Sequence, residues 1–193
     1  MSYAIENILS IMDRDGEDEL MFNLSSFSCS ANNEIQAFLY ENAIEFARKK
    51  ISITYLVTDT EEGELLGYFT LTHKVLEVSA TGLSNSVKKR MSRYARLNEK
   101  TDSYLVSAFL LAQFGKNDNV AEERKISGAE LMDCVDAVLE DIQFRIGGSV
   151  VYLDCEDKPQ LIPFYENTGG YRCISERVSE LDNTKYLQFF KFI

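Results

Sequence analysis

One stretch, residues 103–151, restricts the possible folds of this 193-residue chain more than any other. Residues 104–114 form an apolar run with β-branched and aromatic members, which favours a buried strand. After a polar break, apolar residues recur at three-or-four spacing and predict a helix with one buried stripe: Leu131, Val135, Val138, Leu139, Ile142 and Ile146. Gly147-Gly148 end that helix, and residues 150–153 start a second apolar strand. The stretch therefore predicts a βαβ unit with parallel strands.

The turn before this helix carries most of the chemistry in the stretch. A helix N-terminus offers unpaired N–H groups and the positive end of the helix dipole, so it can hold a phosphate without any particular side chain. Gly128 would let the backbone approach such an anion, and Arg124 and Lys125 add positive charge. A single glycine there equally serves packing or capping, so both interpretations stay open. The P-loop motif and the Gly-x-Gly-x-x-Gly motif of dinucleotide folds are both absent from the sequence.

Composition excludes several classes of protein. A hydrophobic content of 45% supports a real core and argues against disorder. With 31 acidic and 20 basic residues the net charge is −11, and such an average field repels nucleic acid and anionic membranes. No apolar run approaches the roughly 20 residues of a membrane helix, and the first residues lack the features of a signal peptide. We therefore expect one cytoplasmic domain over residues 1–193, with no membrane partner.

The four cysteines and the first part of the chain predict ordinary structural roles. The cysteines are scattered without a Cys-x-x-Cys motif, which indicates reduced core thiols in place of disulfides or zinc ligands. Residues 5–12 have helical spacing, residues 13–19 predict an exposed acidic turn and residues 20–27 predict a first strand. Asn32 or Asn33 can cap the following helix, whose C-terminal end carries three basic residues.

A hairpin follows this helix. Residues 51–58 and 65–72 predict two antiparallel strands joined by a short polar loop. Gly67 inside the second strand indicates a bulge or a close backbone approach. His73, the only histidine, ends this strand. It is either an edge residue or a proton acceptor for an incoming amine, because its intrinsic pKa suits neutral pH.

A basic segment comes next. Residues 84–96 predict a helix that Ser84 or Asn85 caps, and they hold five of the 20 basic residues: Lys88, Lys89, Arg90, Arg93 and Arg96. This segment is either a solvated helix face or a docking surface for an anionic partner or for the phosphates of a ligand. Both interpretations stay open.

The C-terminal part predicts a short helix and two closing strands. Pro159 suits the first turn of the helix over residues 160–167, and Gly169-Gly170 stop it. Residues 171–174 and 185–192 read as strands, with Asp182-Asn183 in the turn between them.

The order of these elements resembles the GNAT family of acyl-CoA-dependent N-acetyltransferases, over about residues 27–192. The most specific match is residues 162–170, which look like the Phe-Tyr-Glu-x-x-Gly-Phe signature of the family. Residues 123–129 correspond to the Gln/Arg-x-x-Gly-x-Gly/Ala loop that grips the CoA pyrophosphate, with Ile126 where the first loop glycine is usual. Within the family, the front half is most similar to the acetyltransferase toxins of toxin–antitoxin pairs.

The resemblance implies an α/β fold (α+β mixed sheet): a GNAT-like, mostly antiparallel, twisted mixed sheet flanked by helices, with a central parallel β-α-β acyl-CoA unit. It implies acetyl-CoA as the cofactor and Tyr165 as the general acid that protonates the departing thiolate. His73, Glu156 or water would accept the proton of the amine. The residues expected to contact acetyl-CoA are Phe114, Gly115, Lys116, Arg124, Lys125, Ile126, Ser127, Gly128 and Ala129.

The acceptor of the acetyl group stays open between aminoacyl-tRNA, a protein and a small amine. The related toxins modify the amine of aminoacyl-tRNA and tend to be basic, so a charge of −11 argues against that acceptor unless residues 88–96 suffice locally. A non-catalytic acyl-CoA-binding or protein-interaction module is the alternative of a different class, and a nucleic-acid-binding protein is a third. The sequence leaves open a homodimer and an antitoxin partner.

Overall fold

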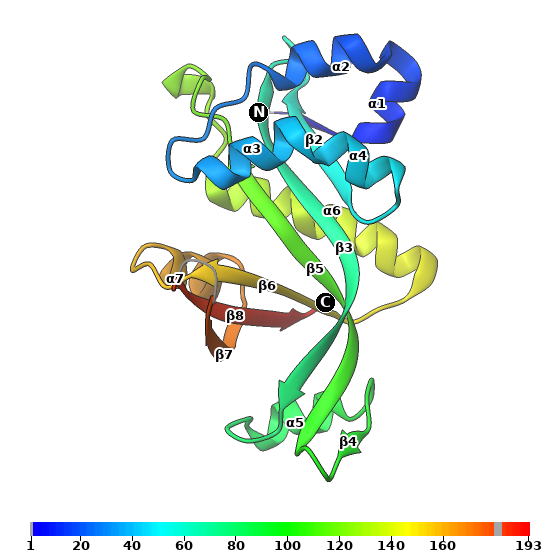
Figure 1. Cartoon of the computed structure of the whole chain (residues 1–193), viewed down its shortest axis with the longest axis vertical. Helices are drawn as coiled ribbons and strands as arrows, with labels where there is room; N and C mark the ends of the chain where they lie inside the picture. Colours follow the sequence, from blue (N-terminus) through cyan, green and yellow to red (C-terminus); the bar gives the residue numbers. More distant parts are fainter. Residues whose placement is uncertain (1, 180–182) are drawn as a thin grey trace. The chain divides into compact units, whose positions relative to one another are not determined.

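The structure, a computed structural model, describes residues 2–179 and 183–193. It divides into two compact units, unit 1 (Met1–Thr72 and Leu111–Val138) and unit 2 (His73–Leu110 and Leu139–Ile193). The described strands form a mixed sheet in the order β1-β2-β3-β5-β6-β8-β7, and the short β4 pairs with β5 (Figure 1). The β5–β6 pair is parallel, whereas β1–β2, β2–β3, β4–β5, β6–β8 and β7–β8 are antiparallel. This mixed, mostly antiparallel α/β sheet confirms the predicted fold class.

The strands of unit 1 confirm the predicted hairpin. β2 (Ile53–Asp59) pairs antiparallel with β3 (Leu65–Ser79), which continues into unit 2. The pairing shifts by one residue beside Gly67, as a β-bulge does. A Cβ atom on Gly67 would lie 2.9 Å from the carbonyl oxygen of Gly115, so the predicted close backbone approach is confirmed as well.

The N-terminal segment differs from the prediction. β1 (Tyr3–Asn7) replaces the start of the expected helix, whereas α1 (Ile8–Asp15) confirms the rest of it and continues into the expected acidic turn. α2 (Glu17–Leu24) replaces the remainder of that turn and the expected first strand. Gly16, at φ +88°, lets the chain change direction between the two helices. Three acidic residues fill the first turn of α2, where negative charge suits the helix dipole. Leu20 and Leu24 lie one helical turn apart and are fully buried, so the apolar run is a helix stripe and not a strand.

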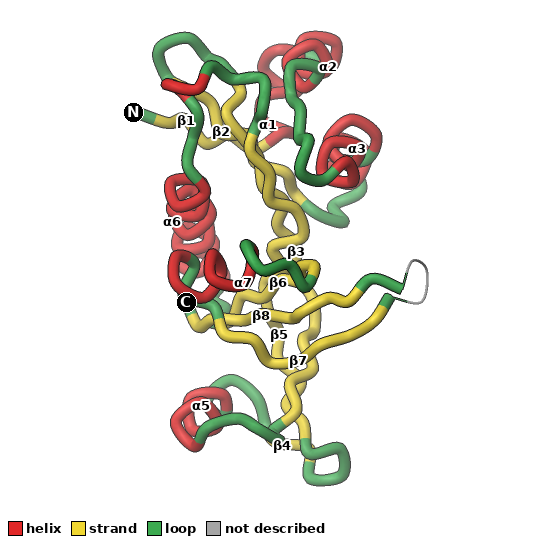
Figure 2. Tube along the Cα trace, turned by 90° about the vertical axis from the view of Figure 1, so that its left-hand side faces the viewer, coloured by secondary structure: helices red, strands yellow, loops and turns green. Residues whose placement is uncertain are grey.

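The next helical region is divided into α3 (Asn33–Glu41) and α4 (Ala43–Arg48). Asn32 caps α3 as predicted, since its side-chain oxygen accepts a hydrogen bond from the Glu34 N–H at 2.9 Å. In Figure 2, α3 lies on one side of the strands of unit 1 and the first part of α6 on the other. Both faces of these strands are therefore covered, which explains why residues 65–71 of β3 are all buried.

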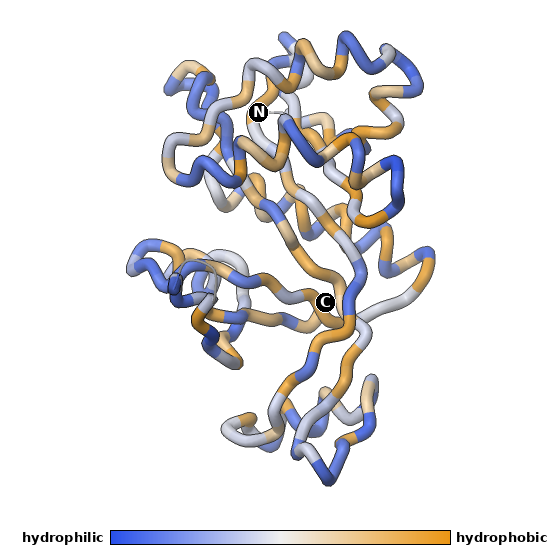
Figure 3. The backbone as a smooth tube through the Cα atoms, viewed as in Figure 1, coloured by the Kyte–Doolittle hydropathy of each residue, from blue (hydrophilic) through white to orange (hydrophobic). Residues whose placement is uncertain are grey.

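The predicted βαβ unit is confirmed, although Ile146, expected in the buried stripe of its helix, is exposed. β5 (Ser103–Lys116) leads through a loop to α6 (Gly128–Ile146) and then to β6 (Val150–Glu156). β5 and β6 pair in parallel at Phe109 and Leu110. Figure 3 shows hydrophobic colour along much of these strands and hydrophilic colour on many connecting turns. α6 ends at Gly147, which has φ +77° and donates its N–H to the Gln143 carbonyl, as expected of a glycine C-cap.

Unit 2 contains the basic segment and the closing strands. The helix expected over residues 84–96 is shorter: Ser84 caps α5 (Asn85–Met91), and the chain then forms β4 (Leu97–Asn98). The two closing strands are confirmed and the first is longer than predicted; the expected turn at Asp182-Asn183 lies partly outside the described residues. The remaining elements are α7 (Leu161–Pro163), a π-helical turn (Phe164–Thr168), β7 (Arg172–Val178) and β8 (Lys185–Phe192).

All four cysteines are free, in agreement with the prediction of reduced thiols, although Cys173 is exposed and so is not a core residue. Among the described residues, every helix is too short or too polar to cross a lipid bilayer.

Candidate acyl-transfer site

Tyr165, the predicted general acid, lies in unit 2 inside the π-helical turn Phe164–Thr168. The Gly169 N–H closes this turn on the Phe164 carbonyl at 3.1 Å, five residues back. Glycine is needed there, because a Cβ atom would lie 2.8 Å from the Tyr171 ring. Single π-turns concentrate at functional sites. The segment that resembles the family signature thus has an irregular backbone where a regular short helix was expected.

Aromatic packing fixes the Tyr165 ring. Its centroid lies 5.1 Å from that of Phe164, 6.1 Å from Tyr171 and 6.0 Å from Phe189. Only 8% of the residue is exposed. Burial, followed by the nearby Cys155 thiol, raises the pKa of the Tyr165 hydroxyl above its ordinary value. The hydroxyl therefore keeps its proton at neutral pH, which a general acid requires.

The predicted pyrophosphate loop lies in unit 1, at the start of α6. Ser127 caps the helix: its Oγ accepts the Glu130 N–H at 3.1 Å, while the Glu130 carboxylate accepts the Ser127 N–H at 2.9 Å. This reciprocal pair is a capping box. The N–H groups of Gly128 and Ala129 have no acceptor among the described residues, so two donors remain for an anion. Ile126 is buried and forms part of the core, so it offers its backbone and not its side chain.

Glu130 brings a negative charge to this helix end. Hydrogen bonds from Ser127 and Tyr3 lower the pKa of its carboxyl to about 2, so it is ionised at neutral pH. The Tyr3 hydroxyl donates to Glu130 Oε1 at 2.7 Å, which ties β1 to α6. The sequence analysis missed this pair, although the Ser-x-x-Glu spacing of Ser127 and Glu130 is a readable capping signal.

The two cations beside the loop are paired within the protein. Arg124, in a 3-10 turn (Glu122–Arg124), lies 2.8 Å from Glu62 and 3.1 Å from Glu64. Lys125 lies 2.7 Å from Glu122. These partners raise the pKa values of Arg124 and Lys125 and partly neutralise the charge that the sequence analysis assigned to an incoming phosphate.

The last residues of β5, expected to hold the pantetheine arm, lie in unit 1 with the loop. Phe114 is half-buried, Gly115 is buried and Lys116 is exposed. Gly115 cannot carry a side chain, because a Cβ atom would lie 2.5 Å from the Ile35 side chain. The chain then turns at Asn117, a buried residue whose amide donates to the Leu65 carbonyl at 2.8 Å. The polar break seen in the sequence is therefore a hydrogen-bonded corner of the fold.

The candidate bases lie in unit 2. His73 lies in the middle of β3 and not at the predicted strand end. It is exposed, its Nε2 lies 3.0 Å from the Ser107 hydroxyl, and its ring centroid lies 5.5 Å from that of Phe109. None of its described contacts involves Tyr165. Glu156, the acidic alternative, pairs with Lys158 at 2.7 Å. The structure thus groups the candidate acid and bases in unit 2 and the candidate acetyl-CoA ligands in unit 1.

Comparison with known proteins identifies the fold. No protein-family model matches the sequence, and no curated protein matches it. Among solved structures, a tyrosine-to-phenylalanine mutant of the toxin AtaT is 18% identical, with a TM-score of 0.65 over 98% of this chain and 89% of that one. AtaT complexed with acetyl-methionyl-tRNAfMet is 17% identical, with a TM-score of 0.62 over 96% and 94%. A tyrosine-to-phenylalanine mutant of KacT is 16% identical, with a TM-score of 0.64 over 96% and 94%.

The chain has a GNAT-like fold. The agreement covers nearly the whole length of each protein, so the GNAT-like fold accounts for both units. Two further structures of AtaT contain acetyl-CoA, one of them with the C-terminus of the antitoxin AtaR. The GNAT-like fold of this chain is thus shared with toxins whose structures hold acetyl-CoA, an acetylated aminoacyl-tRNA or an antitoxin.

Proposed function

We propose that this chain is an acetyl-CoA-dependent N-acetyltransferase that transfers an acetyl group to a primary amine by direct attack. The observation that carries the proposal is Tyr165, a buried tyrosine that keeps its proton, held in a π-turn within a GNAT-like fold. Structures of AtaT and KacT in which one tyrosine is replaced by phenylalanine support a special role for a tyrosine in this fold.

In the proposed reaction, acetyl-CoA supplies an activated thioester, and the residues of the chain bind it and move protons. The Gly128 and Ala129 N–H groups would receive the pyrophosphate, and backbone groups of residues 114–116 would pair with the pantetheine arm. The neutral acceptor amine attacks the thioester carbon, so a C–N bond forms and the C–S bond breaks. Tyr165 gives its hydroxyl proton to the departing sulfur. His73, Glu156 or water would take the proton of the amine.

Replacement of Tyr165 by phenylalanine tests the proposed acid. Tyr165→Phe removes one hydroxyl and keeps the ring packing, so we expect the fold to persist and turnover to fall by about 100-fold, the lower end for general acid catalysis. Tyr104→Phe is the matched control, because Tyr104 is also buried in unit 2 and has no proposed role. Thiol release from acetyl-CoA, measured with a panel of amines, gives the rates. Equal turnover of Tyr165→Phe and wild type across pH would remove Tyr165 from the mechanism.

We propose the aminoacyl end of a tRNA as the first acceptor to test. The structure of AtaT with acetyl-methionyl-tRNAfMet suggests this acceptor, and the distribution of charge removes the objection raised by the net charge of −11. Unit 1 has 19 acidic and 7 basic residues, which give a net charge of −12. Unit 2 has 12 acidic and 13 basic residues, which give a net charge of +1. The acidic excess therefore belongs entirely to unit 1. Transfer of radiolabelled acetyl to methionyl-tRNA, but not to free methionine, would support this acceptor, and the reverse would exclude it.

A non-catalytic acyl-CoA-binding or protein-interaction module is the second candidate function. The capping box at Ser127 and Glu130 favours it, because the helix end already holds a carboxylate where the family binds a pyrophosphate. Calorimetry of acetyl-CoA binding to the wild-type chain and to Gly128→Glu, together with the amine assay, separates the enzyme from the binding module. Binding that Gly128→Glu abolishes, without turnover of any amine in the panel, would favour the module over the enzyme.

A further inference from the structure

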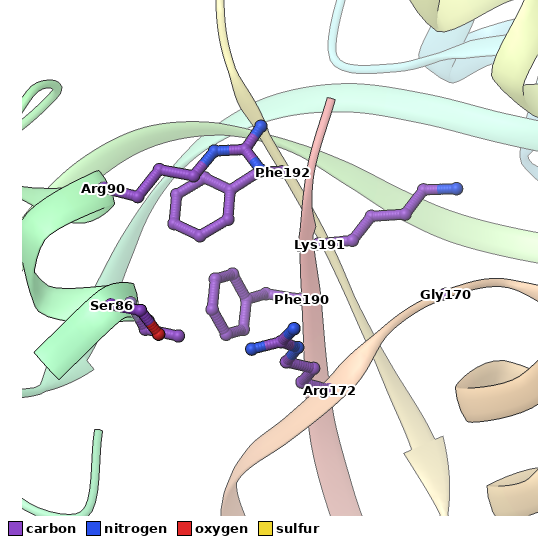
Figure 4. Close-up of a pocket in the computed structure, with 8 residues that line it drawn as sticks. Ser86, Arg90, Gly170, Arg172, Phe190, Lys191 and Phe192 are labelled. Atoms are coloured by element: carbon purple, nitrogen blue, oxygen red, sulfur yellow. The ribbon is translucent and has the colours of Figure 1, made fainter. Parts of the chain in front are cut away.

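A pocket of about 480 Å³ lies in unit 2, and its lining includes neither Tyr165 nor any residue of the predicted pyrophosphate loop. α5 supplies Ser86, Val87 and Arg90, β7 supplies Arg172, and β8 supplies Phe190 and Phe192. Its volume falls in the range of roughly 300–1,000 Å³ that small-molecule sites occupy. In Figure 4, the Arg90 and Arg172 side chains lie at the two ends of the pair of phenylalanine rings.

The register of the sheet creates this arrangement. Arg172 lies directly opposite Phe190 on the neighbouring strand, so both side chains project from the same face, and Phe192 follows two residues later on that face. The Arg90 guanidinium lies 4.2 Å from the centroid of the Phe192 ring. Lys191 extends from the opposite side of β8, where its ammonium lies 4.8 Å from the Tyr171 ring. Phe190 is almost fully buried, and Phe192 is half-buried with the Arg90 guanidinium over its ring. The pocket therefore offers one flat surface, the Arg90–Phe192 stack, and a second guanidinium group on Arg172.

These two arginines lack the carboxylate partners that other cations have. In the described part of the chain, no Asp or Glu lies within ion-pair distance of Arg90 or Arg172. The described ion pairs instead involve nine other cations: Arg14, Arg48, Lys49, Arg124, Lys125, Arg145, Lys158, Arg177 and Lys185. In a chain with 31 acidic residues, two unneutralised guanidinium groups at one pocket indicate a site for an external anion.

We propose that this pocket binds a nucleotide through its phosphate, with the base against the Arg90–Phe192 stack. A guanidinium group matches a phosphate with two parallel hydrogen bonds, and Arg is the side chain best suited to that recognition. A base can stack on an aromatic ring or on a guanidinium plane. The nucleotide is either free or one unit of a nucleic-acid strand, since both present the same phosphate, sugar and base. The proposal is independent of acetyl transfer, because the pocket shares no residue with the proposed acetyl-CoA or acid–base groups.

The surroundings of the pocket favour a nucleotide over an acidic peptide. Four further cations on and beside α5 are likewise without a described ion pair: Lys88, Lys89, Arg93 and Arg96. A carboxylate peptide would use the guanidinium groups but leave the Arg90–Phe192 stack without a flat partner. A nucleotide uses both, because it joins an anionic phosphate to a flat aromatic base.

Calorimetry at low salt with the full chain tests the proposal, with AMP, adenosine and inorganic phosphate as probes. We expect AMP to bind about tenfold or more tightly than either fragment, because only AMP fills both parts of the pocket. Arg172→Gln and Arg90→Gln should each weaken AMP binding by about tenfold. Arg177→Gln is the matched control: Arg177 lies on the same strand, pairs with Asp154 and does not line the pocket.

Acetyl-CoA also contains an adenosine phosphate, so the two sites must be separated. Gly128→Glu, which closes the proposed pyrophosphate loop, should leave AMP binding unchanged, and saturating CoA should not displace AMP. A different result would place AMP at the acetyl-CoA site: CoA displaces AMP, Gly128→Glu abolishes AMP binding and Arg172→Gln leaves it intact. That result would refute the nucleotide pocket and would leave the proposed function unaffected. A loss of turnover in Tyr165→Phe has no bearing on this measurement.

A 12-nucleotide single-stranded RNA distinguishes the two sources of the nucleotide. Tighter and more salt-dependent binding of the RNA than of AMP, lost in Arg172→Gln, assigns the pocket to a strand. Equal affinity for AMP and the RNA assigns it to a free nucleotide. No saturable binding of either probe, or competition by a glutamate-rich peptide at lower concentration than AMP, would overturn the proposal. Circular dichroism and thermal unfolding confirm that each variant is folded. Arg90 and Arg172 are both exposed, but Arg90 also packs over the Phe192 ring, so Arg172 is the safer of the two substitutions.

Discussion

At the scale of single residues, Glu130 sets the charge at the start of α6, where we propose that a pyrophosphate binds. Its carboxylate is ionised at neutral pH and lies at the helix end that would receive a pyrophosphate. Of the N–H groups at that end, its carboxylate accepts only that of Ser127, but its negative charge repels a phosphate at the neighbouring Gly128 and Ala129 N–H groups and shares the positive end of the dipole with it. The side chain therefore stabilises the helix and opposes the proposed ligand.

Glu130→Gln should raise the affinity for acetyl-CoA. Removal of the competing charge is worth roughly 1 kcal/mol at a partly exposed helix end, which corresponds to about a fivefold lower Kd in calorimetry. Glu123→Gln is the control, because it changes the net charge equally but does not cap α6. Unchanged or weaker acetyl-CoA binding in Glu130→Gln would contradict our placement of the pyrophosphate.

Gly115 is a second residue whose environment predicts a large effect of substitution, here on the stability of the fold. An alanine Cβ would lie 2.5 Å from Ile35 Cγ2 and 3.3 Å from the Phe27 ring. We expect Gly115→Ala to lower the free energy of unfolding by roughly 1–3 kcal/mol, as overpacking of a core does. Urea denaturation measures this change. The double variant Ile35→Ala/Gly115→Ala should lose less stability than the two single changes together, and strict additivity would refute the clash.

At the scale of elements, helix caps are a testable source of stability. Asn32 caps α3 through its side chain, whereas Asn33 occupies the first helical position and is exposed. Asn32→Ala should therefore cost about 1 kcal/mol of unfolding free energy, while Asn33→Ala should cost little. Chemical denaturation of both variants checks the difference, and equal losses would show that the cap contributes nothing.

The cap of α6 also predicts that the stability of this helix end depends on pH. The pKa of Glu130 in the folded chain is about 2, below its ordinary value of 4.5, so its charged form is favoured by folding. This stabilisation is fully present above pH 4.5 and is lost as the pH falls from 4.5 toward 2. Hydrogen exchange at the Ser127 amide should accelerate over that window relative to amides in the middle of α6. Glu130→Gln should remove the pH dependence, and its persistence in that variant would assign it to another group.

At the scale of the whole molecule, the charge distribution matters more than the net charge. Unit 1 has a net charge of −12 and unit 2 of +1, and the unpaired cations of residues 88–96 belong to unit 2. An average over the chain hides this difference, because screened electrostatic attraction acts over only about 10 Å at 0.1 M salt. A polyanion near unit 2 would therefore meet a local field unlike the average.

Two matched charge reversals test this distribution. Lys88→Glu with Lys89→Glu and Lys49→Glu with Lys50→Glu change the net charge equally, but in different units. We expect the first pair to abolish retention on a heparin column and the second to change it little. Equal effects of the two pairs would show that net charge alone governs binding to polyanions.

Local patterns in the sequence determined much of this protein. The 3-or-4 spacing of α6, the alternating and apolar runs of the hairpin and of β5, and the cap at Asn32 all depend on neighbours within a few residues, so they could be read directly. The same holds for the Phe-Tyr segment that points to acyl transfer. The early segment at residues 20–27 was misread because a short apolar run has too few residues to separate period 2 from period 3.6.

Only the tertiary structure decided which distant residues act together. The Tyr3–Glu130 hydrogen bond, the pairing of Arg124 with Glu62 and Glu64, and the meeting of Arg90 with Phe192 join residues more than 55 positions apart. Such contacts depend on strand register and on how helices pack against the sheet, which local propensity does not specify. For the same reason, only the structure shows that the cations beside the loop are paired, whereas Arg90 and Arg172 have no ion pair among the described residues.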